Sequence, residues 1–301
     1  MTMQDDAQNA VAAAAGEQLQ APATPAGEGS VPDARPVPGR PGVEVQNVDK
    51  VYGNSTVALR GVDCTLREGE FVSLLGPSGC GKSTLLRIMA GLGGISGGSV
   101  RWWEQGFDVV GMEGHRLAFV FQDPTLMPWA RVRANVRLPL DLMSGANPED
   151  TERRIDEALE MVGLRDFGNA FPRELSGGMQ MRASIARAMV TQPDFLLMDE
   201  PFGALDEMTR NRLNDDILQL WRDKRWTVAF VTHSVFEAVY LSTRIEVMAA
   251  SPGRMASQVL VDEPYPRTSE FRKTHRFTEY CSQVSDALEE ASAVGAQEAT
   301  V

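Results

Sequence analysis

The chain has few of the residues that build disulfide-linked or metal-stabilised folds. Its 301 residues include three cysteines and three histidines. Cys64, Cys80 and Cys281 show no C-x-x-C spacing and no neighbouring histidine cluster. We therefore expect neither a disulfide framework nor a structural metal site, and this cysteine usage is typical of a reducing cytoplasm.

Long hydrophobic runs and an excess of positive charge are also missing. No apolar stretch approaches the roughly 18 residues that a membrane-spanning helix needs, and the acidic start MTMQDD lacks the basic and apolar regions of a signal peptide. The formal net charge is −12, whereas broad nucleic-acid-binding surfaces are usually basic. We expect no nucleic-acid partner, and any membrane crossing must come from another chain.

Composition divides the chain into three parts. Residues 1–42 are rich in Ala, Pro, Gly, Gln and Glu, with almost no aromatic content, which predicts a disordered tail; a binding tail is the functional alternative. Residues 43–265 form the main domain of our interpretation. Residues 266–301 hold a predicted amphipathic helix over 268–291, with Phe271, Tyr280, Val284 and Leu288 as its apolar positions, and then a short tail.

The main domain alternates between predicted strands and helices. Its helix at 148–162 has a complete set of end signals, with Asn147 as N-cap, Pro148 at the first position and Gly163 after the end. The spacing of Ser234 and Glu237 predicts a capping box at a later helix. Strands are expected at 43–52, 70–76, 116–123, 194–200 and 226–233, and further helices at 83–91 and between the last two strands. This order predicts an α/β fold with a largely parallel sheet covered by helices.

The stretch GPSGCGKST at residues 76–84 matches the P-loop pattern, with a strand before it and a helix after it. In such a loop, backbone N–H groups point at phosphate oxygens, and the helix N-terminus adds positive potential. We expect Lys82 to neutralise the β- and γ-phosphates and Ser83 to place its hydroxyl on Mg²⁺, whereas Cys80 points away. The loop residues are Gly76, Pro77, Ser78, Gly79, Cys80, Gly81, Lys82, Ser83 and Thr84. The alternative is a glycine-rich surface turn.

Two carboxylates follow the predicted strand in LLMDE. Ligands of parallel sheets bind beyond the carboxyl ends of the strands. Asp199 could therefore join the magnesium shell, and Glu200 could act as a general base toward the attacking water. An ordinary acidic turn after a strand is the alternative.

Three further polar or aromatic residues each allow a functional and a structural interpretation. Gln122 and His233 end predicted strands near the same edge, where they could touch Mg²⁺ and the phosphate, or could be structural. Tyr52 could stack on a purine or fill a gap in the packing.

A second sequence with the features of an anion cradle is LSGGMQ at residues 175–180. Ser176 can cap a helix, while Gly177 and Gly178 allow close backbone approach. This segment has no lysine, and so it contrasts with the P-loop a hundred residues earlier.

In their order along the chain, these motifs resemble the ATP-binding cassette (ABC) ATPases over about residues 43–260. The resemblance implies a P-loop NTPase (RecA-like) core, an antiparallel β edge and a helical subdomain at about 123–190. It implies ATP and Mg²⁺ as ligands and a head-to-tail dimer with a second copy. In that dimer Ser176, Gly177, Gly178 and Gln180 of one subunit would complete the site around Lys82 of the partner subunit.

The same resemblance implies individual roles. Tyr52 would stack on adenine, and Gln122 would touch Mg²⁺, with Ser83 and Asp199 as the other metal-site residues. Asp206, in GALD, would lie at the dimer contact. Lys82, Glu200 and His233 would be the catalytic residues, with His233 holding the γ-phosphate and the attacking water.

The stretches around Gln122, LSGGMQ and His233 are similar to the nitrate/sulfonate/taurine importer branch of this family. That likeness implies a peripheral subunit on the cytoplasmic face of the inner membrane, bound to integral-membrane permease subunits and served indirectly by a solute-binding protein. The apolar segment after Gln122, which includes Trp129, would form the permease groove, or would pack between the lobes. An exporter or lipoprotein transporter, a non-transport ABC ATPase and a catalytically silent subunit are the rival readings.

Overall fold

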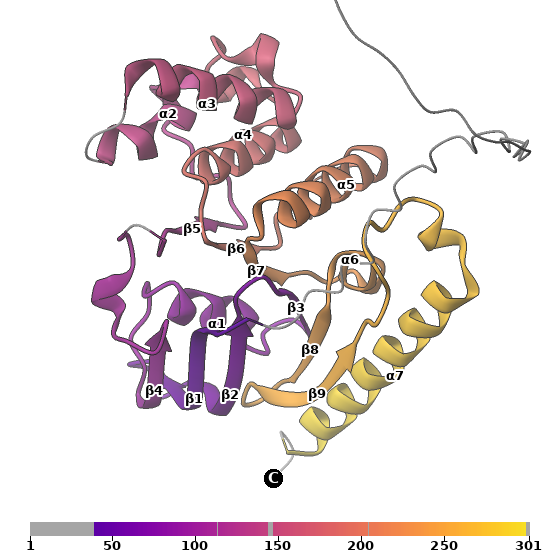
Figure 1. Cartoon of the computed structure of the whole chain (residues 1–301). Coiled ribbons are helices and arrows are strands. Elements are labelled where there is room, and N and C mark those ends of the chain that lie inside the picture. Colours follow the sequence, from indigo (N-terminus) through magenta and orange to yellow (C-terminus); the bar gives the residue numbers. More distant parts are fainter. Residues whose placement is uncertain (1–38, 113, 144–146, 204, 299–301) are drawn as a thin grey trace, which may run out of the picture. The chain divides into compact units, whose positions relative to one another are not determined.

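A computed structural model describes residues 39–112, 114–143, 147–203 and 205–298 of the chain (Figure 1). Residues 1–38 of the predicted tail and the last three residues of the chain lie outside the described residues. The first described strand begins at Pro41, two residues before its predicted start.

The central sheet has six strands in the order β5-β6-β7-β3-β8-β9. Their bounds are β5 Leu117–Val120, β6 Phe195–Asp199, β7 Thr227–Val231, β3 Phe71–Leu75, β8 Arg244–Ala249 and β9 Arg254–Leu260. The first five strands are parallel, and β9 pairs antiparallel with β8. Because the parallel strands point the same way, their carboxyl ends gather at one edge, which confirms the predicted α/β class.

An antiparallel sheet of three strands accompanies the central one, in the order β2-β1-β4. Its strands are β1 Pro41–Val51, β2 Val57–Arg67 and β4 Gly97–Trp102. Helix α1, Lys82–Met89, shares one apolar cluster with both sheets, to which it contributes Leu85 and Met89. The helix is therefore held by packing on two sides, and so is the loop that leads into it.

Alternate residues of the central strands face a second apolar cluster. Leu196 and Met198 of β6, for example, belong to this cluster, whereas Leu197 between them belongs to the first. The helices that contribute to the second cluster include α5 Glu207–Lys224, α6 Val235–Leu241 and α7 His275–Glu298. Both faces of the central strands are thus buried, which explains their nearly continuous hydrophobic sequences.

The α-helices described between β5 and β6 are α2 Val132–Leu142, α3 Pro148–Met161 and α4 Gly177–Met189. They pack on one another and form the magenta group of Figure 1. The predicted start of α3 is confirmed, because the side chain of Asn147 accepts a hydrogen bond from the N–H of Glu149 at 3.0 Å. Ile155, Ala158 and Leu159 form the buried face of this helix.

The prediction of one helix over 268–291 is wrong at its start. Phe271 lies in a short 3₁₀ turn, Phe271–Lys273, and α7 begins at His275. The reason is a cap that the apolar spacing does not reveal: the Thr274 hydroxyl accepts a hydrogen bond from the N–H of Phe277 at 3.1 Å. The other short 3₁₀ turns are Phe107–Val109, Arg165–Phe167 and Pro172–Glu174.

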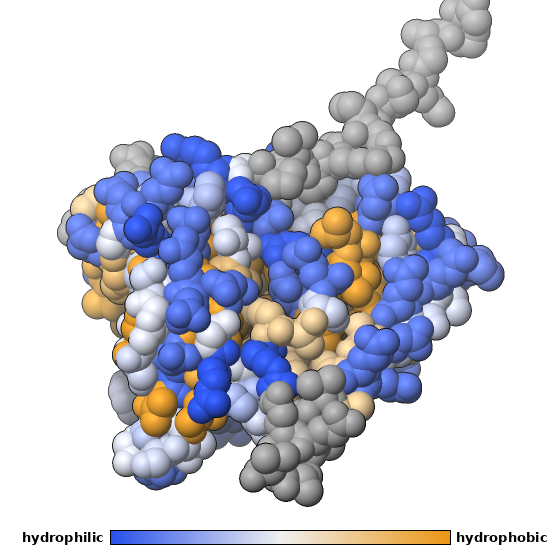
Figure 2. Space-filling model, turned by 90° about the horizontal axis from the view of Figure 1, so that it is seen from below, coloured by the Kyte–Doolittle hydropathy of each residue, from blue (hydrophilic) through white to orange (hydrophobic). Residues whose placement is uncertain are grey.

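The surface seen from below in Figure 2 mixes hydrophilic side chains with separate hydrophobic patches. Within the described ranges, no helix combines the length and the hydropathy needed to cross a membrane.

Candidate functional site

The loop between β3 and α1 has the backbone of a phosphate cradle. Gly76, Gly79 and Gly81 adopt positive φ angles of 153°, 78° and 94°, which residues with side chains rarely adopt. A Cβ on Gly76 would also lie 2.5 Å from the carbonyl oxygen of Met248. The turn therefore favours glycine at all three positions, and close packing behind the loop requires it at Gly76 as well.

Lys82 is buried within this loop. Its Nζ donates to the carbonyl oxygens of Gly76 and Pro77 at 2.7 and 3.0 Å. Cys80 lies below it, fully buried, and burial raises the pKa of its thiol while the nearby ammonium opposes the shift. The Cys80 sulfur lies 3.7 Å from the same Nζ, so the thiol is enclosed within the loop and the loop's own atoms hold the lysine charge.

Asp199 ends β6 beneath the loop. Its Oδ1 accepts a hydrogen bond of 2.8 Å from the Ser83 hydroxyl, and its carboxylate is almost fully buried. Burial raises its pKa, and the hydrogen bond from Ser83 opposes that shift. A hydroxyl and a carboxylate side by side suit the oxygen preference of Mg²⁺. No group of three or more His, Cys, Asp or Glu side chains among the described residues could hold a metal by itself, so such an ion would need oxygens of a phosphate substrate as well.

Three predicted residues meet at the carboxyl ends of β5, β6 and β7. Glu200 follows β6, and its Oε1 lies 2.6 Å from Nε2 of His233, which follows β7. Its Oε2 accepts a hydrogen bond of 3.3 Å from Nε2 of Gln122, which follows β5. Glu200 adopts a φ of 48°, unusual for a residue with a side chain, at the point where its carboxylate meets the other two groups.

These groups line one open pocket of about 600 Å³ beside the phosphate loop. Tyr52 forms part of its wall, with 44% of the residue exposed and its hydroxyl 3.2 Å from Oγ1 of Thr84. The predicted residues that it brings together are Tyr52, Ser78, Gly79, Gly81, Lys82, Ser83, Thr84, Gln122, Glu200 and His233. The predicted loop residues Gly76, Pro77 and Cys80, together with Asp199, lie behind this lining.

Five lining residues were missed: Thr56, Val57, Ala58, Ser251 and Gly253. The N–H of Gly253 donates to the carbonyl of Ala58 at 3.1 Å, and a Cβ on Gly253 would lie 2.1 Å from the carbonyl oxygen of Cys80. The turn after β8 therefore supports the phosphate loop directly. The only local signal was the turn sequence SPG, which says nothing about what the turn touches.

The lining does not include the second predicted cradle. Ser176 caps α4 by accepting a hydrogen bond from the N–H of Met179 at 3.3 Å, which confirms the predicted helix start. Ser176 and Gly177 are exposed, and Nε2 of Gln180 donates to the carbonyl of Leu175 at 3.3 Å. Within one chain, the two cradles therefore belong to different surfaces.

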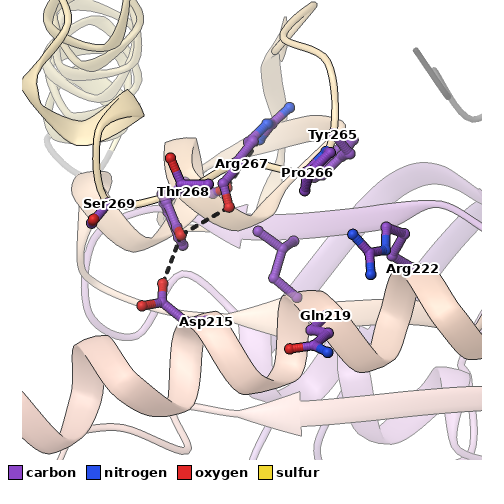
Figure 3. A pocket seen from close by; sticks show the side chains of 10 residues that line it. Asp215, Gln219, Arg222, Tyr265, Pro266, Arg267, Thr268 and Ser269 are labelled. Atoms are coloured by element: carbon purple, nitrogen blue, oxygen red, sulfur yellow. Dashed lines mark hydrogen bonds between the residues drawn. The ribbon is translucent and has the colours of Figure 1, made fainter. Parts of the chain in front are cut away.

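A separate pocket of about 330 Å³ lies between α5 and residues 265–269 (Figure 3). Its charged groups already have partners. Asp215 accepts hydrogen bonds from the Tyr240 hydroxyl at 2.6 Å and from Arg272 at 3.1 Å, and Arg222 pairs with Asp223 at 2.9 Å. We therefore place the candidate active site at the phosphate loop.

Comparison with known proteins agrees with this geometry. Residues 59–203 match the family model for ABC transporters. The chain is 43% identical over 223 residues to the aliphatic sulfonates import ATP-binding protein SsuB of Bacillus licheniformis. This alignment covers 73% of this chain and 85% of the relative. It is 42% identical to SsuB of Bacillus subtilis, over 71% of this chain and 82% of the relative.

Solved structures give the same assignment. The dimeric post-hydrolysis structure of the ATP-binding cassette MJ0796, bound to ADP and Pi, has a TM-score of 0.67 and 33% identity, covering 73% of this chain and 99% of that one. The motifs, the fold and these relatives agree: the chain belongs to the ABC transporter family, as an ATP-hydrolysing, ATP-binding subunit of the importer-type branch.

Proposed function

We propose that the chain hydrolyses ATP at a site shared between two copies and thereby drives import of a small sulfonate-, nitrate- or taurine-like solute through a separate permease. The observation that carries this proposal is the convergence of Lys82, Glu200 and His233 on one pocket, while the exposed Ser176 cradle lies outside it.

The proposed binding step uses the phosphate loop. The N–H groups of the loop and Nζ of Lys82 hold the phosphates, and the ring of Tyr52 stacks on adenine. Ser83, Asp199 and Gln122 hold Mg²⁺, which neutralises charge on the phosphate oxygens when bound. Support comes from the Ser83–Asp199 contact and from the position of Tyr52 in the pocket wall.

The proposed hydrolytic step is an in-line attack by water on the γ-phosphorus. Glu200 accepts a proton from that water as the new P–O bond forms and the bond to ADP breaks. His233 orients the γ-phosphate and the water. The 2.6 Å contact between Glu200 and His233 supports this division of roles, because it fixes the carboxylate relative to the imidazole.

In the proposed dimer, the second cradle completes the ATP site of the partner subunit. The N-terminus of α4 carries partial positive charge, and Ser176, Gly177 and Gly178 present it on the surface. In a head-to-tail pair, this end and Gln180 would face a γ-phosphate held by Lys82 of the partner subunit, and Asp206 would lie at the contact. ATP would then hold the two copies together until hydrolysis. The dimeric structures of the MJ0796 cassette support this assembly.

The transport partners in this proposal are integral-membrane permease subunits at the cytoplasmic face of the inner membrane and, indirectly, a solute-binding protein. The two SsuB relatives, named for aliphatic sulfonate import, support the solute class. Trp129 is 75% exposed and Leu142 78% exposed in the apolar segment that we propose as the permease groove. The proposed parts of the chain are a tail at 1–42, the ATPase domain at 43–265 and a C-terminal helix with a short tail at 266–301.

Dimerisation of Glu200→Gln tests the shared site. With ATP and Mg²⁺, light scattering after size exclusion should show a dimer, because ATP binds and is not consumed. Adding Ser176→Arg should return the protein to a monomer, because the long side chain blocks the cradle. Glu289→Gln, on the exposed face of α7, is the control. A Glu200→Gln protein that stays monomeric at saturating ATP would contradict the proposal.

A further inference from the structure

Glu237 is a buried carboxylate beside the candidate active site, and none of the steps above uses it. Only 7% of the residue is exposed. Burial raises its pKa, while the hydrogen bond from Thr232 and the charge of Arg210 lower it. An acidic side chain buried in this way is costly unless its oxygens have partners, so its partners show what it does.

The first oxygen holds the turn that carries His233. The predicted capping box forms only in part: Ser234 accepts a hydrogen bond from the N–H of Glu237 at 3.3 Å, but the carboxylate does not return to the N–H of Ser234. Instead, Oε2 of Glu237 accepts a hydrogen bond from the Thr232 hydroxyl. That hydroxyl accepts the N–H of Ser234 at 3.0 Å. The residues on both sides of His233 are thus fixed through Glu237.

The second oxygen faces the start of α5. Oε1 of Glu237 lies 3.5 Å from Nε of Arg210. Nη2 of the same guanidinium donates to the carbonyl of Leu205 at 2.9 Å. Leu205 directly precedes Asp206, which caps α5 through the N–H of Thr209 at 2.9 Å. One side chain therefore joins the His233 turn to the segment that we place at the dimer contact.

A cavity of about 100 Å³ lies between these groups and the reactive pair. Glu200 and His233 line one part of it, and Arg210, Thr232 and Glu237 line another. His233 itself is half exposed, with 49% of its side chain accessible. Because packing covers only half of the side chain, the position of the ring depends on its contact with Glu200 and on the backbone on either side.

We propose that Glu237 is a positioning residue: through Thr232 it fixes His233 against Glu200, and through Arg210 it makes that position depend on Leu205 and Asp206 at the subunit contact. Docking of a second copy would thereby complete the hydrolytic geometry. This inference rests on the proposed function, because it assumes that His233 acts on the γ-phosphate.

Steady-state ATPase kinetics test the inference with a matched pair of variants. Thr232→Val keeps the shape of the buried side chain and removes its hydroxyl, whereas Thr232→Ser keeps the hydroxyl. We expect Thr232→Val and Glu237→Gln to lower kcat about tenfold, because a misplacement of a catalytic group by about 1 Å can cost about a hundredfold and these variants should cause a smaller shift. KM for ATP should change less than about twofold, because the phosphate loop is untouched. Thr232→Ser should restore most of kcat.

Double variants show whether the contacts act as one unit. Arg210→Met combined with Glu237→Gln should lose no more than about twofold beyond the more affected single variant, because contacting residues are not additive. A wild-type kcat in both Thr232→Val and Glu237→Gln would overturn the inference. So would losses that multiply in the double variant. If either variant fails to fold, the other carries the test.

Failure of this inference is distinguishable from failure of the proposed function. The inference fails when the wild-type protein hydrolyses ATP and Lys82→Ala does not, yet Thr232→Val and Glu237→Gln behave as wild type. The proposed function fails when the wild-type protein itself shows no ATP hydrolysis at any concentration of Mg²⁺ and ATP.

Discussion

Oγ of Ser83 donates a hydrogen bond to Oδ1 of Asp199 across 2.8 Å. The first residue belongs to the phosphate loop and the second to the end of β6, so the contact joins segments far apart in the sequence. It also leaves a buried carboxylate that forms no ion pair with the residues that the structure describes. In the proposed function this carboxylate would serve Mg²⁺ at the expense of the stability of the free protein.

Asp199→Asn should stabilise the protein without nucleotide. Burial raises the pKa of Asp199 in the folded state, so the native state binds its proton more tightly than the unfolded state. The ionised carboxylate therefore destabilises the fold at pH 7, and this cost disappears as the pH falls below the ordinary value of 3.8. We expect Tm at pH 7 to rise by about 2–4 °C, which corresponds to about 1 kcal/mol.

Differential scanning fluorimetry between pH 7 and pH 4 would measure this gain, which should shrink toward the acid end. Asp286→Asn, on the exposed side of α7, is the control and should leave Tm unchanged. Mg²⁺-dependent ATP hydrolysis should fall in Asp199→Asn alone. A lower Tm at pH 7 would show that the carboxylate contributes to the fold.

Lys82→Ala should weaken ATP binding. A charged hydrogen bond to phosphate contributes about 1.5–3 kcal/mol, which corresponds to roughly a 10- to 150-fold rise in Kd. Isothermal titration calorimetry with ATP and Mg²⁺ would measure this rise in Kd. Lys224→Ala, at the exposed end of α5, removes the same charge elsewhere and should bind as wild type. Equal affinities in the two variants would exclude the phosphate role of Lys82.

Gly253→Ala should disturb the phosphate loop from behind. Its new methyl group would meet the carbonyl oxygen of Cys80 at 2.1 Å, so the loop or the turn after β8 must move. Overpacking of this kind costs about 1–3 kcal/mol, and ATP affinity should fall with stability. Urea unfolding and nucleotide titration would measure both. Gly94→Ala, where an added Cβ has no neighbour within 4 Å, is the control; similar behaviour of the two variants would contradict the packing argument.

Arg267→Ala should destabilise the chain far from the site. The guanidinium of Arg267 is buried and donates to five carbonyl oxygens, those of Val239, Tyr240, Ser242, Val261 and Glu263. Removing it leaves these acceptors unpaired, which we expect to cost about 3 kcal/mol or more. The unfolding midpoint in urea should fall, while KM for ATP stays unchanged at low temperature. Arg101→Ala, at an exposed position of β4, should leave the midpoint in place.

The sequence predicted those parts of the site that are short motifs or residues directly after a strand. The P-loop, the carboxylates after β6 and the groups after β5 and β7 each follow a strand, and a parallel sheet brings such ends together whatever the details of packing. Gln122, Glu200 and His233 therefore meet as expected.

The parts that were missed depend on contacts between distant turns. Thr56, Val57 and Ala58 follow the turn after β1, and Ser251 and Gly253 follow β8; they reach the pocket because Leu59 pairs with Gly253. No periodicity or motif encodes that pairing. The start of α7 was misplaced for a similar reason, since a single hydroxyl at Thr274 outweighs the apolar spacing.

The burial of Cys80 has a chemical consequence. A thiol in the middle of a phosphate loop would ordinarily expose the enzyme to alkylation and oxidation, because the thiolate is the reactive form. Here the sulfur is inaccessible and its pKa is raised, and Cys64 and Cys281 are also buried. The folded enzyme should therefore keep its activity in maleimide or peroxide, and without added reductant.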